Sequence, residues 1–152
     1  MEPDIMNLDE KTDPATKRML QNLIDRKKKF DRFKSRHLLS VWVTIGLISI
    51  YFYYLYVTIM KPYSYSFAEI FSVYVQNSAN LYFLIVTVGT YGLMVLLKEK
   101  REKAEKEYQA LRCEIVDRSK DLWKREEEWK NRHIVFDMMK KKFDINLYHE
   151  NK

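Results

Sequence analysis

The sequence predicts an all-α membrane protein: a helical hairpin of two transmembrane helices with further helices on its cytoplasmic side. Residues 38 to 60 form a run without a charged side chain, and residues 80 to 97 form a second one. The chain has only three Gly and three Pro, none of them between Leu93 and Lys152, so long helices are expected there. Nothing shows the alternation of apolar and polar residues that is typical of strands.

Both uncharged runs are long enough to cross a bilayer. At about 1.5 Å per residue, residues 38 to 60 extend over roughly 35 Å, against about 30 Å for the hydrocarbon core. Residues 80 to 97 reach roughly 27 Å, and either the inclusion of Ala79 or slight bilayer thinning accommodates this shorter span. A cleaved signal peptide is not indicated, because the first run begins only at Leu38 and ends at Lys61 and Pro62 without a small-residue cleavage site.

The basic residues predict the orientation. The net charge is +6, and residues 26 to 37 carry seven Lys or Arg, residues 98 to 112 carry six, and the connecting loop only Lys61. The positive-inside rule then places both termini in the cytoplasm and predicts a multi-pass protein of the plasma membrane, with anionic lipid at the basic flanks. The predicted segments are a cytoplasmic N-terminal segment (1–37), transmembrane helices (38–60 and 80–97), an outer loop (61–79) and a cytoplasmic helical tail (98–152).

The N-terminal segment predicts a basic helix. Residues 1 to 12 are polar and expected to be loose, and Asp13 and Pro14 are a typical helix start. The helix has one basic face and an apolar stripe of Met19, Leu20, Leu23, Ile24, Phe30 and Phe33, interrupted by Lys27. Two interpretations are open: an amphipathic helix lying on anionic lipid, or a topology signal with a solvated face.

A short amphipathic helix is expected over residues 66 to 76 of the outer loop. Ser66 and Glu69 match a capping box, in which the Ser66 hydroxyl accepts from the Glu69 N–H and the Glu69 carboxylate reaches back to the Ser66 N–H. Apolar side chains recur at helical spacing: Phe67, Ile70, Phe71, Tyr74 and Val75. This face either lies in the outer membrane interface or packs on the two transmembrane helices.

The transmembrane runs contain aromatic and small residues in typical places. Four tyrosines of the first run suit the outer interface: Tyr51, Tyr53, Tyr54 and Tyr56. Small residues on both runs favour close helix packing, within one chain or between copies, over a polar pore lining: Ser40, Thr44, Gly46, Thr87, Gly89, Thr90 and Gly92.

The cytoplasmic tail repeats an apolar residue every seven positions: Tyr108, Ile115, Leu122, Trp129, Phe136 and Phe143. This spacing is typical of the a positions of a coiled coil, but arginines occupy three of the d positions: Arg118, Arg125 and Arg132. The alternatives are a helix that packs locally on another cytoplasmic helix and a break near Ser119 to Lys124. Residues 140 to 152 either fray or dock.

No motif indicates chemistry, so the sequence predicts a protein that is not an enzyme and has no catalytic, cofactor-binding or metal-binding residues. The histidines His37, His133 and His149 lack partners at zinc spacing, and Cys113 has no His within a helical turn. The transmembrane runs contain no ionisable Asp, Glu, Lys, Arg or His, which argues against a transporter acting as a monomer. No nucleic-acid module is recognisable.

Three stretches carry a resemblance to a known family: Lys29 to Lys34, Lys103 to Ile115, and Lys142 to Tyr148. The chain resembles the YpbF-type small membrane proteins of Bacillus-like bacteria over nearly its whole length. The resemblance implies a two-span protein of the plasma membrane and brings no functional residue with it.

Two functions from different classes follow as hypotheses. The first is a membrane-anchored interaction or assembly protein, whose residues 98 to 152 bind a partner protein or a second copy. The alternative is a small transport or permeability component, formed when the Thr and Gly faces oligomerise. A membrane-embedded enzyme is third, because it requires paired acid and base groups at the interface and Glu69 is the lone acid of the loop.

Overall fold

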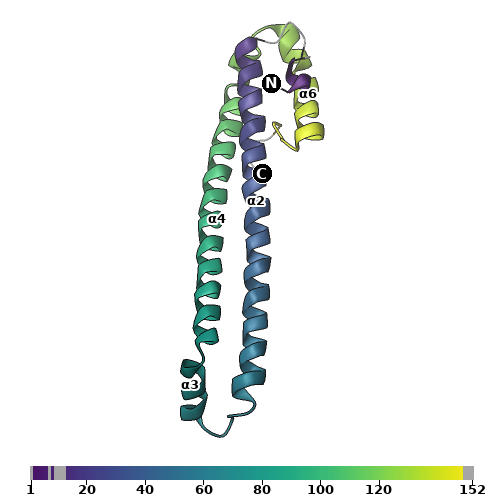
Figure 1. The fold of residues 1–152 in the computed structure, drawn as a ribbon. Helices are drawn as coiled ribbons and strands as arrows, with labels where there is room; N and C mark the ends of the chain where they lie inside the picture. The colour runs from purple at the N-terminus through teal and green to yellow at the C-terminus, as the bar shows by residue number, and fades with distance from the viewer. Residues whose placement is uncertain (1, 7, 9–12, 149–152) are drawn as a thin grey trace. The chain divides into compact units, whose positions relative to one another are not determined.

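The computed structural model describes residues 2–6, 8 and 13–148, and all regular secondary structure in these residues is helical, which confirms the predicted all-α class (Figure 1). The elements are α1 (Pro3–Met6), α2 (Pro14–Leu55), the π-helix η1 (Tyr56–Met60), α3 (Phe67–Gln76), α4 (Ser78–Asp117), α5 (Ser119–Leu122) and α6 (Glu126–Phe143). The chain divides into two compact units. We call residues 1–33 with 101–152 the head, and residues 34–100 the apolar unit.

Two long helices, α2 and α4, each contribute one part to both units. The start of α2 is as predicted: Pro14 is its first residue, and the Ala15 N–H lies 3.3 Å from Asp13 Oδ1. Each helix passes without a break through a predicted membrane boundary, α2 at residues 37–38 and α4 at residues 97–98. The long helix expected from the absence of Gly and Pro after Leu93 thus continues beyond Lys98 to Asp117.

The head has its own hydrophobic core, formed by α1, α2, α4, α6 and the segments that follow α5 and α6. Its buried side chains are Ile5, Leu20, Leu23, Ile24, Tyr108, Leu111, Ile115, Trp123, Val135, Phe136, Met139, Ile145 and Leu147. Leu20, Leu23 and Ile24 are fully buried here. The N-terminal stripe from Met19 to Phe30 is therefore a core face, and the interpretation of an amphipathic helix that lies with this face on anionic lipid is wrong, because these side chains already have protein partners.

The seven-residue repeat of the tail lies on three helices that share this core. Tyr108 and Ile115 belong to α4, Leu122 to α5, and Trp129, Phe136 and Phe143 to α6, and each is buried in the core or packed against it. A long coiled coil is wrong. The break predicted near Ser119 to Lys124 is confirmed, because α4 ends at Asp117 and α6 begins at Glu126. Arg118 and Arg125 lie at this break, where their side chains are 64% and 77% exposed.

Both described ends of the chain pack into the core of the head. Ile5 of α1 is fully buried, so the expectation that residues 1 to 12 are loose is wrong for residues 2–6. After α6, Asp144 adopts a left-handed conformation (φ 56°), and the Ile145 N–H donates to the Met139 carbonyl at 3.1 Å. This reversal buries Ile145 and Leu147, so the tail docks as far as Tyr148.

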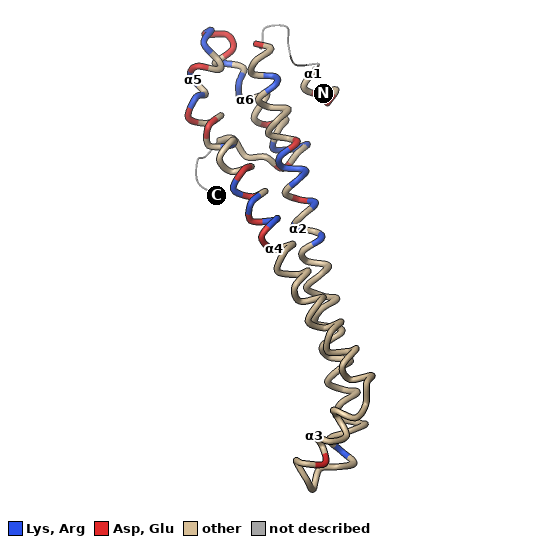
Figure 2. The backbone as a smooth tube through the Cα atoms, turned by 60° about the vertical axis from the view of Figure 1, so that its left-hand side comes forward, with Lys and Arg blue, Asp and Glu red and all other residues tan. Residues whose placement is uncertain are grey.

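The apolar unit buries little of its own hydrophobic surface. Figure 2 shows α2 and α4 without charged residues over their apolar stretches. Of the most apolar window of each helix only 17% and 6% is buried in the protein. Both helices are long and apolar enough to cross a membrane. A core helix of a water-soluble protein would instead be mostly buried.

Polar side chains join α3 to the two long helices of the apolar unit. The Tyr51 hydroxyl lies 2.9 Å from the Tyr74 hydroxyl, and Asn80 Nδ2 donates to the Tyr74 carbonyl at 2.9 Å. The Tyr51 ring stacks on Phe83 with centroids 5.8 Å apart. Tyr51 is only 7% exposed, and hydrogen bonds inside the protein satisfy its hydroxyl; its place in the outer membrane interface stays a prediction.

The loop helix lies where the sequence places it, with two corrections. Ser66 Oγ accepts a hydrogen bond from the Glu69 N–H at 3.4 Å. The Glu69 carboxylate, however, accepts one from the Tyr65 hydroxyl, and the Ser66 N–H donates to the Tyr63 carbonyl instead. Half of the capping box therefore forms. The apolar face is also divided, because Tyr74 packs inward while Phe67 and Phe71 are exposed by 82% and 62%.

The glycines do not bring the two long helices of one chain together. A Cβ added at Gly46, Gly89 or Gly92 would meet nothing within 4 Å, so close packing within the chain is wrong for these residues. Thr44, which is 3% exposed, faces the protein instead. A role of the glycines between copies stays a prediction.

Candidate functional surfaces

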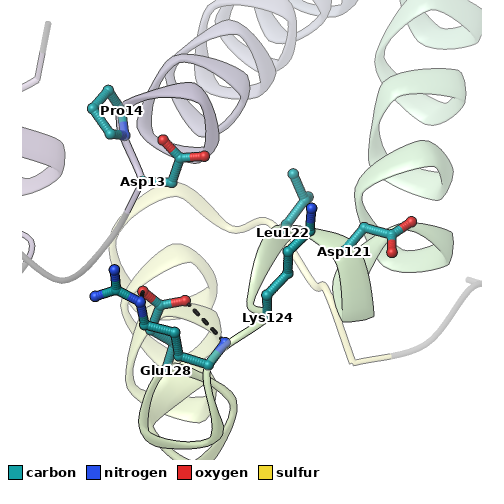
Figure 3. Close-up of a pocket in the computed structure, with 7 residues that line it drawn as sticks. Asp13, Pro14, Asp121, Leu122, Lys124 and Glu128 are labelled. Atoms are coloured by element: carbon teal, nitrogen blue, oxygen red, sulfur yellow. Dashed lines mark hydrogen bonds and ion pairs between the residues drawn. The ribbon is translucent and has the colours of Figure 1, made fainter.

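The head has a charged hollow of about 350 Å³ at one end (Figure 3). Its lining comes from the start of α2, from α5, from the segment leading into α6 and from the first turn of α6: Asp13, Pro14, Asp121, Leu122, Lys124, Arg125 and Glu128. The Glu128 carboxylate accepts the Arg125 N–H at 3.4 Å and lies 3.9 Å from Arg125 Nε. Three carboxylates of this lining lie beside two cations, and the described residues that line it include no Cys, His or Ser to act as a nucleophile.

A second hollow of the head, about 320 Å³, is rich in lysine and lies between α2 and the end of α6. Its central group is Lys27, whose side chain is only 13% exposed. Lys27 Nζ lies 3.1 Å from Asp31 and 3.5 Å from Asp144, and it is 5.8 Å from the ring centroids of both Phe30 and Tyr108. The base that interrupts the apolar stripe is thus a specific partner of two acids and two rings.

The electrostatics of Lys27 favour its charged form. Burial lowers the pKa of Lys27, but the hydrogen bond to Asp31 and the charges of Asp31 and Asp144 outweigh this, so the pKa is raised overall. Burial raises the pKa of the neighbouring Tyr108. The site therefore holds a positive charge against a neutral phenol over the physiological pH range, which suits a structural ion pair rather than a group that exchanges protons.

A second ion pair joins the two long helices within the head. Lys29 Nζ lies 3.1 Å from the Glu107 carboxylate, and Arg26 donates to the Glu107 carbonyl at 2.8 Å. The hydrogen bond from Lys29 lowers the pKa of Glu107. Because these groups are largely solvated, their contribution is orientation of α2 against α4 rather than much stability.

The apolar unit has a groove of about 360 Å³ between α2 and α4. Its lining is Arg36, Leu39, Ser40, Val43, Thr44, Thr90, Leu93 and Leu97. The groove is almost wholly apolar, with a single charged group, Arg36.

The structure does not gather the residues that the sequence singled out for chemistry. Cys113 is half-buried on α4, and His133 on α6 lies with Nδ1 2.7 Å from the Lys130 carbonyl, while His149 is outside the described residues. Among the residues that the structure describes, no group of three or more His, Cys, Asp or Glu could hold a metal ion. Sequence reasoning did not single out Lys27 or Arg36 as a residue of a candidate site. The signal that could have found Lys27 is a basic residue within an apolar stripe.

Fold and surfaces together define an all-helical protein with a packed head and two helices long and apolar enough to cross a membrane. The chain belongs to the family described as "Protein of unknown function (DUF2663)", which matches residues 19–150. It is 34% identical over 145 residues to the "Uncharacterized protein YpbF" of Bacillus subtilis (strain 168), covering 95% of each chain. The resemblance noted in the sequence is thereby confirmed. No solved structure matches the chain.

Proposed function

We propose that this chain is a non-enzymatic membrane-anchored interaction protein, in which α2 and α4 cross the plasma membrane as a hairpin and the head binds a partner protein or a second copy in the cytoplasm. The observation that carries the proposal is the difference in packing between the two units of the chain. The head closes a core of its own, whereas the apolar unit leaves most of its hydrophobic surface uncovered. An anchor and a separately folded binding module have these two requirements.

The exposed side chains of the apolar unit support the membrane part of the proposal. Large apolar residues are at least 55% exposed along both helices, among them Leu38, Leu39, Trp42, Ile50, Phe52, Tyr53, Ile85, Val88, Leu93 and Leu96. At about 25 cal/mol per Å² of apolar surface, contact of this area with water would be strongly unfavourable. A bilayer covers such a surface without requiring a protein partner.

Cysteine labelling in spheroplasts tests the proposed orientation. In a Cys113→Ser background, Ser64→Cys places a thiol on the exposed outer loop and Ser35→Cys places one on the exposed basic flank of α2. A membrane-impermeant maleimide should label position 64 in intact spheroplasts and position 35 only after permeabilisation. The reverse pattern would overturn the orientation, and labelling of both in intact spheroplasts would overturn the hairpin.

The exposed side of α6 offers the head a binding surface. Ile134 is 57% exposed on this helix, whereas its neighbour Val135 is 6% exposed and faces the core. A photocrosslinking residue at position 134 of the full chain in cells should give a discrete product larger than the monomer. The same residue at position 135 is the matched control and should react within the chain. Only monomeric products from position 134 would remove the main support for the interaction role.

The alternative of an oligomeric permeability component gains little support from the side chains. The hydroxyls of Ser40, Thr44, Thr87 and Thr90 all donate to carbonyls of their own helices. Groups bonded in this way offer few free donors to a permeating ion or solute.

A further inference from the structure

The groove between α2 and α4 is apolar in its walls although three hydroxyls line it. Ser40 Oγ donates to the His37 carbonyl at 2.7 Å, Thr44 Oγ1 to the Ser40 carbonyl at 2.8 Å, and Thr90 Oγ1 to the Thr87 carbonyl at 2.9 Å. With these donors occupied, the groove presents methyl and methylene groups. Such a lining suits a hydrocarbon chain and offers little to a polar ligand.

A guanidinium lies at one end of this groove. Arg36 is the only charged residue of the lining, and its exposed side chain makes no hydrogen bond or ion pair within the part of the chain that the structure describes. It lies two residues before the uncharged run that begins at Leu38, with His37 between them. The surrounding charge is also positive, since residues 34–37 and 98–101 together hold five Lys or Arg and one Glu.

We propose that this groove binds one anionic phospholipid, with an acyl chain against Leu39, Val43 and Leu93 and the headgroup phosphate on Arg36. The inference deepens the proposed function, since it rests on the apolar unit being in a membrane. A guanidinium pairs with phosphate through two parallel N–H···O bonds, and the groove volume of about 360 Å³ suits a single chain-like occupant. The net positive surroundings favour an anionic lipid over a zwitterionic one.

Native mass spectrometry of the full chain tests this site. The protein is released from mixed micelles that contain phosphatidylglycerol and phosphatidylcholine with identical acyl chains in equal amounts. The wild-type chain should retain one phosphatidylglycerol per copy in preference to phosphatidylcholine. Arg36→Gln should reduce that preference about tenfold, as loss of a charge-assisted contact does. Lys100→Gln, an equal change of charge at an exposed position outside the groove, should leave it unchanged.

A second pair of variants tests the acyl-chain part. Val43→Phe narrows the groove without changing its charge and should lower retention of phosphatidylglycerol, whereas Val86→Phe, on an exposed face outside the lining, should not. Equal loss with Arg36→Gln and Lys100→Gln would show bulk electrostatic attraction and overturn the site. Equal retention of both lipids by the wild-type chain would also overturn it. In either case resistance to alkaline extraction would keep the membrane proposal intact, and extraction of the wild-type chain would overturn both.

Discussion

Replacing Ile115 by Ala should lower the free energy of unfolding of the head by about 2–5 kcal/mol. Ile115 is fully buried on α4, in a core that α2 and α6 complete. Removing three of its side-chain carbons loses their burial and leaves a cavity that three packed helices can only partly close. Since a domain is stable by only about 5–15 kcal/mol in total, this is a large part of the head's stability.

Tryptophan fluorescence measures this effect, because Trp123 is 3% exposed in the same core and its ring packs edge-on against Phe136. The full chain in detergent should show an earlier denaturant-induced change in emission when Ile115 is replaced. Ile134→Ala, a similar truncation at a 57% exposed position, should leave the transition in place. Equal shifts for the two variants would show that α4 and α6 do not share this core.

Placing a lysine at Val88 should shift membrane insertion of α4 about 100-fold against the inserted state. Val88 is 61% exposed and lies near the middle of the uncharged run from residue 80 to 97. A lysine at the centre of a transmembrane helix costs about 2.5–3.5 kcal/mol, and each 1.4 kcal/mol is a factor of ten. If this face were in contact with water, the same substitution would be neutral or would improve solubility. The direction of the effect therefore shows whether lipid or water surrounds Val88.

Ile134→Lys is the matched control, because Ile134 is exposed to a similar degree on the head. Alkaline extraction of membranes should release part of the Val88→Lys chain and none of the Ile134→Lys chain. If both variants are retained equally, the exposed face of α4 is not in contact with lipid and the membrane anchor is wrong.

Much of the fold was readable from local patterns. Asp13 and Pro14 mark the start of α2, and Lys61 and Pro62 follow the last residue of η1, because a proline has no N–H to continue a helix. The helix break near Ser119 to Lys124 was one of the alternatives open from the sequence, and arginines stand at positions that a long coiled coil would bury.

The functional surfaces were less readable, since each depends on which helix faces which. Lys27 looked like an interruption of a stripe until Asp144, far along the chain, completed its ion pair. Arg36 was one of seven bases before the first apolar run, and only the groove beside it distinguishes it from the others.

The sequence by itself determined the all-helical class, the two uncharged runs and the concentration of bases beside them, because helix propensity, hydropathy and charge act over a few residues. Tertiary structure alone decided that the N-terminal stripe and the seven-residue repeat form one core, that Tyr51 points inward and that the glycines face outward. A periodic pattern marks which face of a helix is apolar. What covers that face, protein or lipid, depends on how distant segments pack.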